Sequence, residues 1–230
     1  MQRTAVVAGA TGGIGEAVVA ALAAAGYCVL ALGRNAEKLA ALEAEAVLCD
    51  LAALDTLPEP LAGLDRVDAL VHCAGISEVA SVEDSSRGLW DETFAVNVSG
   101  PATLTRALLP ALRAARGRIV FVNAAPGLRA VRNWSAYTAS KAALRELADA
   151  LREEEREHGV RVTSIYPGGV RTELLRKVRG QLGVPYDPAV TVSPQTLASL
   201  VLTVLEFPED AELLDVSLRA ATAAGRTGSR

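Results

Sequence analysis

A tyrosine and a lysine four residues apart are the side chains whose types and spacing most clearly suggest chemistry. Tyr137 and Lys141 lie in a stretch from Ser135 to Glu157 that has the pattern of a long helix. The i, i+4 spacing places both side chains on one helix face. A free tyrosine has a pKa near 10 and is a poor base at neutral pH. An ammonium group one turn away favours the phenolate, so this pair is suited to exchanging a proton with a substrate oxygen.

A glycine-rich cluster near the start of the chain is the second chemical feature. It reads Gly9-Ala10-Thr11-Gly12-Gly13-Ile14-Gly15. It separates an apolar run over 4–8 from a helix expected over 17–25. Glycines let the backbone approach a pyrophosphate closely, and the helix N-terminus behind them offers free N–H groups and a favourable dipole. The cluster therefore predicts a dinucleotide site, with Gly9, Thr11, Gly13, Ile14 and Gly15 as contacts.

The residues after the second apolar run indicate which dinucleotide is bound. A site for NAD usually carries an acidic residue about 20 residues after the glycines, where it binds the ribose 2′-hydroxyl. Here the run ends Leu32-Gly33-Arg34-Asn35, and the first carboxylate is Glu37. Glycine leaves room for a 2′-phosphate, and the planar guanidinium of Arg34 is suited to pairing with it. We therefore expect NADP(H) in preference to NAD(H).

Apolar runs and amphipathic stretches alternate along the chain. Strands are expected over 4–8, 27–32, 46–49, 67–72, 118–122, 160–166 and 213–216. Helices are expected over 17–25, 36–44, 89–112 with an interruption at Gly100-Pro101, 135–157 and 194–205, with an irregular stretch from 167 to 193. Continuous apolar strands joined by helices require right-handed crossovers and a sheet covered on both faces. The predicted fold is α/β: a single-domain Rossmann fold over 1–230, with a doubly wound seven-stranded parallel sheet and a tail over 219–230 expected to be disordered.

Composition argues against several other classes of protein. The 230 residues include 23 Lys and Arg against 27 Asp and Glu, a formal net charge of −4 without a dense basic cluster, so neither nucleic acid nor membrane is an expected partner. No apolar run is long enough to span a bilayer, and the first strand begins too early to leave room for a signal peptide. Cys28, Cys49 and Cys73 form no C-x-x-C pair, which favours buried free thiols in a reducing compartment. A cytoplasmic protein without a metal centre is expected, because His72 and His158 alone do not form a metal cluster.

The glycine spacing G-x-x-x-G-x-G, together with Y-x-x-x-K, resembles the classical short-chain dehydrogenase/reductase family. The resemblance continues along nearly the whole chain. It implies an oxidoreductase that transfers a hydride between NADP(H) and a small alcohol or carbonyl substrate. It also implies that Lys141 holds the nicotinamide ribose. Asn97, in a segment that matches the family's N-V-x-G, would bend its helix and help to hold a proton-relay water.

Three further segments resemble cofactor contacts of that family. Asp50-Leu51 corresponds to the pair that meets the adenine ring. His72-Cys73-Ala74-Gly75 resembles N-N-A-G but replaces both asparagines. The segment over 167–172 resembles P-G-x-x-x-T, in which the backbone and a threonine hold the nicotinamide carboxamide. The contacts that the resemblance implies are Asp50, Leu51, Ala74, Gly75, Tyr137, Lys141, Pro167, Gly168, Val170 and Thr172.

The sequence departs from the family at one catalytic position. The family's serine, which donates a hydrogen bond to the substrate oxygen, lies 13 residues before the tyrosine, where this chain has Ala124. The alternative donors of this hydrogen bond are Asn123, a backbone N–H or a water. Ser140 is expected to point away from the Tyr137–Lys141 face. Two functions therefore stay open: a working oxidoreductase, or an NADP(H)-binding sensor or scaffold that has lost catalysis.

The sequence gives less information about the substrate and the oligomeric state. In relatives the substrate binds beneath the segment that here covers 173–193, where three basic residues either attract an anion or form a solvated face. These are Arg176, Lys177 and Arg179. The stretches 103–113 and 135–157 carry more Ala and Leu than one buried stripe needs, notably Leu108, Leu112, Ala143, Leu147 and Leu151. In relatives these two helices pair across a twofold axis, so a homodimer or homotetramer is expected.

Overall fold

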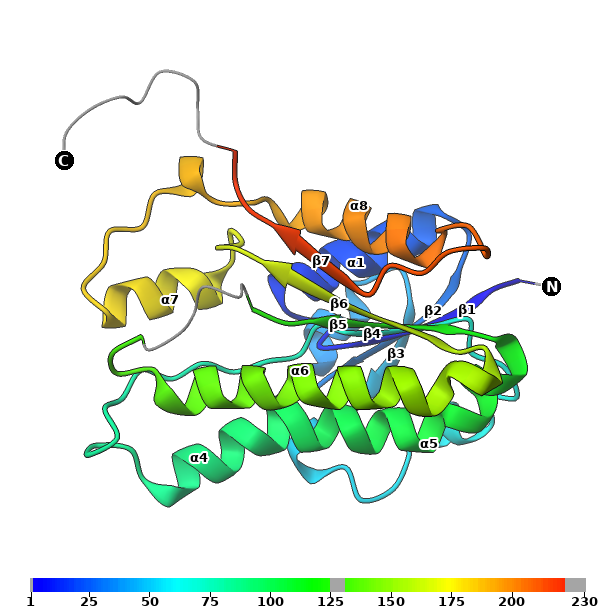
Figure 1. Ribbon diagram of the computed structural model, residues 1–230, viewed down its shortest axis with the longest axis horizontal. Coiled ribbons are helices and arrows are strands. Elements are labelled where there is room, and N and C mark those ends of the chain that lie inside the picture. Colours follow the sequence, from blue (N-terminus) through cyan, green and yellow to red (C-terminus); the bar gives the residue numbers. More distant parts are fainter. Residues whose placement is uncertain (1, 125–130, 222–230) are drawn as a thin grey trace.

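Strands and helices alternate in the computed structural model, which describes residues 2–124 and 131–221 (Figure 1). The strands are β1 (Thr4–Ala8), β2 (Cys28–Gly33), β3 (Glu45–Leu48), β4 (Ala69–His72), β5 (Arg118–Val122), β6 (Arg161–Pro167) and β7 (Asp215–Leu218). The α-helices are α1 (Gly13–Ala24), α2 (Ala36–Ala40), α3 (Glu59–Ala62), α4 (Arg87–Phe94), α5 (Gly100–Ala115), α6 (Ser135–Glu155), α7 (Glu173–Gln181) and α8 (Pro194–Leu205).

The seven strands form one parallel sheet in the order β3-β2-β1-β4-β5-β6-β7. This confirms the predicted doubly wound α/β fold. From β1 the chain builds the sheet outward through β2 and β3, then returns to place β4 on the other side of β1. The connections that leave the carboxyl ends of β1 and β4 therefore diverge. Ligands of open α/β sheets bind in the crevice at such a point.

Helices cover both faces of the sheet, and adjacent strand residues face opposite layers. Val7 is fully buried in the cluster that includes the inner faces of α1 and α8. Its neighbour Val6 is fully buried in the cluster that includes α5 and α6. Figure 1 shows these two helix pairs on opposite sides of the sheet. Two-sided burial explains why central strands such as β1 and β4 are apolar runs without alternation.

Several element boundaries differ from those predicted. Helix α1 begins at Gly13, four residues before the expected start, because the glycine turn leads directly into it. The last strand lies at Asp215–Leu218, two residues later than expected. The expected irregular stretch contains a helix, α7, whose first turn is capped by the Thr172 hydroxyl accepting from the Leu175 N–H at 3.2 Å. Only Val178 of this helix is buried, so its sequence lacks a broad apolar face.

The long central helix is interrupted around Gly100-Pro101, as predicted, and the interruption ends immediately before Gly100. One turn of π-helix over Ala95–Ser99 separates α4 from α5. Pro101 then occupies the first turn of α5, where its missing N–H needs no partner. A Cβ at Gly100 would lie 2.5 Å from the Leu51 carbonyl oxygen, so this close approach requires glycine.

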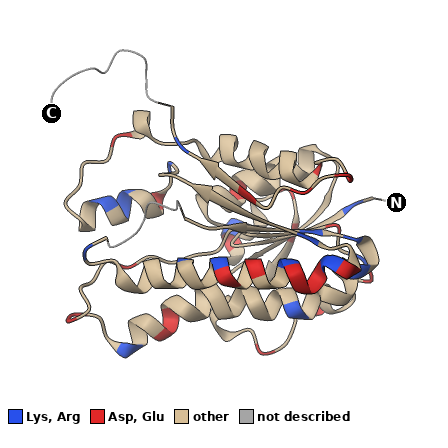
Figure 2. Ribbon diagram, in the orientation of Figure 1, with Lys and Arg blue, Asp and Glu red and all other residues tan. Residues whose placement is uncertain are grey.

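Two expectations about side-chain burial need correction. Leu108, Leu112 and Leu151 are buried in the core of the chain itself. They are therefore not apolar surface left over for a contact between subunits, as the predicted oligomer assumed. Only Ala143 and Leu147 of that set are partly exposed, and Figure 2 shows mixed charges along the second half of α6. Of the three free cysteines, Cys28 is exposed.

Candidate active site

The glycine turn between β1 and α1 is a tightly packed piece of backbone. Gly9 has a φ of +79°, and a Cβ there would lie 2.5 Å from the backbone nitrogen of Ala74. A Cβ on Gly15 would lie 2.1 Å from the Gly9 carbonyl oxygen. The helix begins after Gly12 without a side-chain cap, so no side chain of the turn occupies the first N–H groups of α1. The turn thus presents free backbone donors at a helix N-terminus, as a bound phosphate requires.

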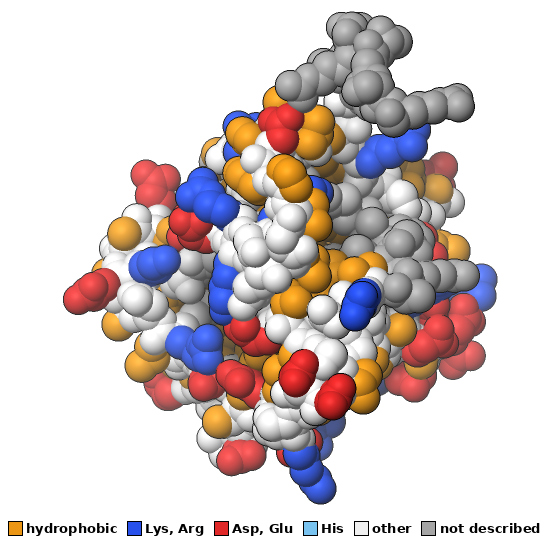
Figure 3. Space-filling model, turned by 90° about the vertical axis from the view of Figure 1, so that its left-hand side faces the viewer, with side chains coloured by type: hydrophobic (Ala, Val, Ile, Leu, Met, Phe, Trp, Pro, Cys, Tyr) orange, Lys and Arg blue, Asp and Glu red, His pale blue; other side chains and the backbone are white. Residues whose placement is uncertain are grey.

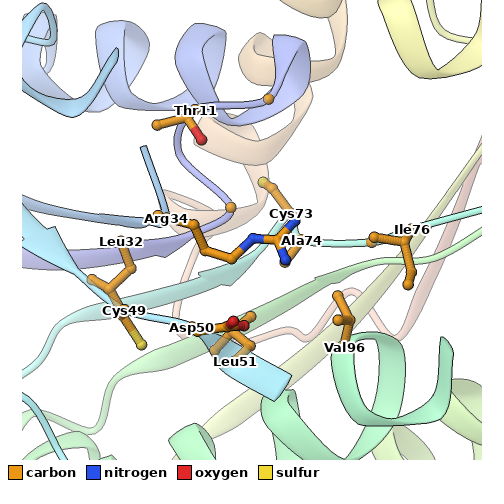
Figure 4. A pocket seen from close by; sticks show the side chains of 14 residues that line it. Thr11, Leu32, Arg34, Cys49, Asp50, Leu51, Cys73, Ala74, Ile76 and Val96 are labelled. Atoms are coloured by element: carbon orange, nitrogen blue, oxygen red, sulfur yellow. The ribbon is translucent and has the colours of Figure 1, made fainter. Parts of the chain in front are cut away.

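A cavity of about 240 Å³ opens at this turn, at the carboxyl ends of β1, β2 and β4 (Figure 4). Among its lining residues are seven that the sequence predicted, namely Gly9, Thr11, Arg34, Asp50, Leu51, Ala74 and Gly75. It is also lined by residues that were not predicted as cofactor contacts, such as Leu32, Cys49, Cys73, Ile76 and Val96. The structure therefore brings the predicted cofactor contacts of four separate segments together.

Arg34 and Gly33 shape the end of this cavity formed by β2. The Arg34 side chain reaches into the cavity from the end of the strand (Figure 4). In the described part of the chain it makes no ion pair, although Asp50 lines the same cavity. Asp50 instead caps a short 3-10 turn by accepting from the Ala52 N–H at 3.0 Å. A Cβ on Gly33 would meet the Thr11 side chain at 3.0 Å, so the glycine keeps this corner open.

A second cavity, of about 360 Å³, lies between α6, the end of β6 and α7. Its walls include the predicted residues Ile14, Tyr137, Pro167, Gly168, Val170 and Thr172. Asn123 and Ala124 contribute to the same lining. A Cβ on Gly13 would lie 3.2 Å from Cγ2 of Thr172, so the glycine turn touches the segment that edges this cavity.

Tyr137 and Lys141 lie together on α6, as the helical spacing predicted. The Lys141 ammonium is 5.9 Å from the centroid of the Tyr137 ring and donates to the Val122 carbonyl at 3.2 Å. Burial lowers the pKa of Lys141 to about 8. Burial also raises the pKa of Tyr137 to about 12, opposite to the expected lowering by the lysine. The neutral phenol is therefore the form of Tyr137 at neutral pH, which makes it a proton donor.

Asn97 is fixed within the π-helical turn by hydrogen bonds on both sides of its amide. Its Oδ1 accepts from the Ile76 N–H at 2.9 Å, and its Nδ2 donates to the Ile76 carbonyl and to Ser140 Oγ, each at 3.0 Å. The Ser140 hydroxyl donates in turn to the Tyr137 carbonyl at 2.8 Å. Ser140 thus faces Asn97, consistent with its expected orientation away from the Tyr137–Lys141 face. These contacts tie α6 to the loop after β4.

Gly75 connects the first cavity with the lysine and the asparagine. It lines the cavity at the glycine turn. A Cβ added there would lie 3.5 Å from Asn97 Oδ1 and 3.7 Å from Lys141 Nζ. Because Lys141 follows Tyr137 on the same helix, Gly75 stands between the site predicted for the dinucleotide and the site predicted for proton transfer.

Ala124 lies where the family's serine was expected, beside the second cavity with Tyr137. Its side chain donates no hydrogen bond. Its N–H donates to Oδ1 of Asn123 at 2.9 Å. The following residues, 125–130, lie outside the described part of the chain.

Sequence reasoning missed an aromatic wall of the second cavity. Trp134 stacks on Tyr137 with ring centroids 4.6 Å apart, and its Nε1 donates to Ser77 Oγ at 2.6 Å. Trp134 immediately precedes α6, so its spacing of three residues from Tyr137 was a signal available in the sequence. The stack supports the tyrosine ring and joins α6 to the loop after β4.

A dinucleotide fits the residues that are present. The glycines leave room that a Cβ would fill, and Arg34 lacks an ion-pair partner in the described residues. The glycine turn contributes to both cavities, with Gly9, Thr11 and Gly12 in the first and Ile14 in the second. Residues of the first cavity would hold the adenosine phosphate end, and Thr172 with the segment over 167–170 would edge the nicotinamide end. In the described residues, no group of His, Cys, Asp or Glu is placed to hold a metal ion, and no helix is long and apolar enough to cross a membrane.

Comparison with known proteins agrees with this site. Residues 3–183 match the short chain dehydrogenase family. An uncharacterized short-chain type dehydrogenase/reductase of Sinorhizobium fredii is 36% identical over 214 residues, covering 89% of this chain and 86% of that protein. The crystal structure of a short-chain dehydrogenase/reductase family oxidoreductase from Burkholderia thailandensis superposes with a TM-score of 0.82 at 28% identity, covering 95% of this chain and 92% of that one. A metagenomic short-chain oxidoreductase in complex with NADP has a TM-score of 0.77 at 29% identity, covering 96% and 98%.

The chain belongs to the short-chain dehydrogenase/reductase family. It is an NAD(P)-dependent oxidoreductase acting on CH–OH or C=O groups. The sequence-based assignment of the family is thereby confirmed.

Proposed function

We propose that this protein catalyses reversible hydride transfer between NADP(H) and an alcohol or carbonyl compound, with Tyr137 as the general acid and base. The observation that carries this proposal is the position of Tyr137: its half-buried side chain lines the second cavity with Thr172 and the segment over 167–170. When bound, the reduced nicotinamide supplies a hydride to the carbonyl carbon. Tyr137 gives its proton to the carbonyl oxygen, so that an alcohol and the oxidised cofactor are formed.

Lys141 and Asn97 assist this proton transfer. A charged Lys141 beside the ring stabilises the negative charge that develops on the tyrosine oxygen as the proton leaves. Asn97 holds the loop after β4 against α6 through its contacts with Ile76 and Ser140. Because burial raises the pKa of Tyr137 to about 12, the phenol keeps its proton throughout the neutral range, as a donor to a carbonyl oxygen requires.

The preference for NADP(H) over NAD(H) is part of the proposal. It is supported by Arg34, which reaches into the first cavity without an ion-pair partner among the described residues, and by the absence of an acidic residue before Glu37 at the end of β2. It is also supported by a relative that was crystallised with NADP.

A cytoplasmic location stays a prediction from the three free cysteines. A homodimer or homotetramer stays a prediction that light scattering tests, because a monomeric mass would contradict it.

A second function is favoured by one observation, the alanine at position 124. A protein that binds NADP(H) without turning over substrate would act as a redox sensor or a scaffold. A panel of aldehydes and ketones, followed by loss of NADPH absorbance, separates the two. We expect turnover of at least one carbonyl class, and calorimetry of NADPH binding provides the parallel measurement. Tight NADPH binding without turnover of any compound would favour the sensor.

A further inference from the structure

The three basic side chains of α7 differ in what they contact. Arg176 pairs with Glu173 at 3.2 Å and lies 5.5 Å above the centre of the Tyr186 ring. Lys177 pairs with Glu78 at 2.5 Å. Both are exposed and neither lines a cavity. These two charges are already compensated within the protein.

Arg179 is the exception on this helix. It lines the second cavity, is partly buried, and has no carboxylate partner in residues 2–124 and 131–221. Its one hydrogen bond runs from Nη1 to the Pro185 carbonyl at 3.2 Å. A guanidinium has five N–H donors in a planar arrangement that matches carboxylate and phosphate oxygens. Arg179 therefore retains donors for an anionic group in the cavity.

The rest of the wall formed by α7 is aliphatic. Leu174, Leu175, Val178, Leu182 and Val184 all line the cavity. Leu174 is 40% exposed and Val184 is 43% exposed, and both belong to the six large hydrophobic side chains that are exposed in the described residues. In Figure 3 hydrophobic side chains gather in the middle of this face, with charged side chains around them. An apolar ligand that covers these side chains removes their area from water.

Building on the proposed function, we infer that the substrate is a carbonyl compound with an aliphatic body and an anionic end that pairs with Arg179. The carbonyl lies at Tyr137, and the aliphatic body lies along α7. Arg179 pairs with the anionic oxygen group. The charge on the substrate can be a carboxylate or a phosphate, because the guanidinium recognises the oxygen geometry that both share.

Matched probes test this inference. An aliphatic oxo acid, its methyl ester and the corresponding oxo phosphate are compared by kcat/KM with NADPH, and by calorimetric binding to the NADP⁺-loaded protein. We expect both anionic probes to exceed the ester by about tenfold, and Arg179→Gln to reduce this ratio to near one. Arg176→Gln is the matched control on the same helix and should leave the ratio unchanged.

The binding measurement separates this inference from the proposed function. Preferential binding of the anionic probes without turnover would support the substrate class and count against the oxidoreductase proposal. Equal binding of acid, phosphate and ester, or a preference that persists in Arg179→Gln, would overturn the substrate class alone. A preference for one anion over the other identifies the end group.

A separate observation concerns Asn123, beside the alanine that replaces the family's serine. Asn123 is 5% exposed and lines the cavity shared with Tyr137 and Ala124. Its Oδ1 accepts from the Ala124 N–H at 2.9 Å, which fixes the orientation of the amide. Its Nδ2 has no hydrogen-bond partner in the described residues. A buried donor without an acceptor is unfavourable, and such groups in native proteins often have a functional reason.

We propose that Nδ2 of Asn123 donates the hydrogen bond to the substrate oxygen that the serine supplies in the family. Substrate then provides the acceptor that the described residues do not supply. The bond strengthens as negative charge develops on the oxygen during reduction. The loss of the serine at position 124 is thereby compensated by its neighbour.

A double-mutant cycle tests this role. Asn123→Asp keeps the acceptor for the Ala124 N–H but removes the donor, so kcat should fall by about 10²–10³ while NADPH affinity is kept. Ala124→Ser supplies a hydroxyl, and in that background Asn123→Asp should cost less than about tenfold. An equal loss in both backgrounds, or full activity of Asn123→Asp, would overturn the proposal.

A binding measurement tests the same role in a protein that shows no turnover. In a ¹⁵N spectrum of the NADP⁺-loaded protein, the side-chain amide resonances of Asn123 are those that disappear in Asn123→Asp. NADP⁺ cannot reduce a ketone, so adding cyclohexanone forms an unreactive complex in which these resonances should shift. If other cavity resonances shift and those of Asn123 do not, Nδ2 is not the donor.

Discussion

The two cavities at the carboxyl edge of the sheet are built from different parts of the chain. The lining of the first includes four glycines, Gly9, Gly12, Gly33 and Gly75, beside side chains such as Arg34 and Asp50. The second is formed mainly by side chains, from the aromatic rings of Trp134 and Tyr137 to the aliphatic residues of α7. The first holds seven of the sixteen residues that the sequence predicted as cofactor contacts, and the second holds six. The second also holds Ala124, which replaces the family's catalytic serine.

This difference separates what is common to the family from what is individual. The glycine turn depends on the absence of side chains at particular positions, because a Cβ at Gly9 or Gly15 would clash with neighbouring backbone. A side-chain site tolerates many combinations of residues, provided that the cavity stays open. We therefore expect changes in the first cavity to affect folding and cofactor affinity, and changes in the second to affect turnover and substrate choice.

The strongest test of the second region is Tyr137→Phe. The change removes the proposed proton donor but keeps the ring and its stack on Trp134. We expect kcat to fall by about 10²–10⁴ and NADPH affinity to stay within about twofold. Turnover is followed by loss of NADPH absorbance, with affinity measured by calorimetry. Tyr27→Phe, a buried tyrosine of the core outside both cavities, is the control and should keep its activity. A comparable loss in that control, or little loss in Tyr137→Phe, would contradict the assignment.

The strongest test of the first region is a pair of alanine substitutions in the glycine turn. Gly15→Ala places a Cβ 2.1 Å from the Gly9 carbonyl oxygen, so the backbone must move. Gly12→Ala places its Cβ 3.5 Å from the same oxygen, which is an ordinary contact. We expect Gly15→Ala to lower the free energy of unfolding by about 2–4 kcal/mol and Gly12→Ala by less than about 1 kcal/mol. Urea unfolding followed by circular dichroism measures both. Equal stability of the two variants would show that the turn is not constrained as described.

Arg34→Ala tests whether the first cavity selects the phosphorylated cofactor. Removing a charge-assisted contact costs about 1.5–3 kcal/mol, and because Arg34 is exposed we expect the lower end, roughly a tenfold weaker binding of NADPH. NADH affinity should be unchanged, since it lacks the 2′-phosphate. Arg87→Ala, an exposed arginine on α4 paired with Asp91, is the control. If calorimetry of the unmodified protein gives equal affinities for both cofactors, the assignment of NADP(H) is wrong.

The fold was predictable because its signals are local and repeated. Two-sided burial of strands such as Thr4–Ala8 produces apolar runs that the sequence shows directly. Asn35 is of a residue type favoured at helix starts, and it caps α2: its Oδ1 accepts from the Lys38 N–H at 2.9 Å. Helix α7 was not predicted because Val178 is its only buried residue. Its other apolar side chains line a cavity and do not form an amphipathic stripe packed on the sheet. Amphipathic periodicity reports packing against the core, not the lining of a ligand site.

The candidate site was predictable to the extent that it depends on spacing. The glycine turn and the Tyr137–Lys141 pair each have a fixed spacing, and the structure places them as expected. The pKa of Tyr137 was not predictable, because it depends on burial by residues far away in the sequence. Within residues 2–124 and 131–221, Nδ2 of Asn123 has no hydrogen-bond partner and Arg179 has no carboxylate partner. Neither was predictable, because such partners come from residues distant in the sequence.

The smallest expected effect is the pH dependence of carbonyl reduction, which joins the two regions through Lys141. Burial lowers the pKa of Lys141 from 10.5 to about 8, so the ammonium is charged below that pH and loses its proton above it. The pKa of Tyr137, raised to about 12, keeps the phenol protonated across the same range. The rate at saturating NADPH should therefore be level below pH 8 and fall as the pH rises through about 8, by roughly tenfold if the charge contributes about 1.4 kcal/mol.

Lys141→Met should have a low rate that does not change between pH 7 and about 9, because the titrating group is gone. A fall that persists in this variant would assign the titration to another group, and a rate that rises with pH would show that Tyr137 acts as its phenolate.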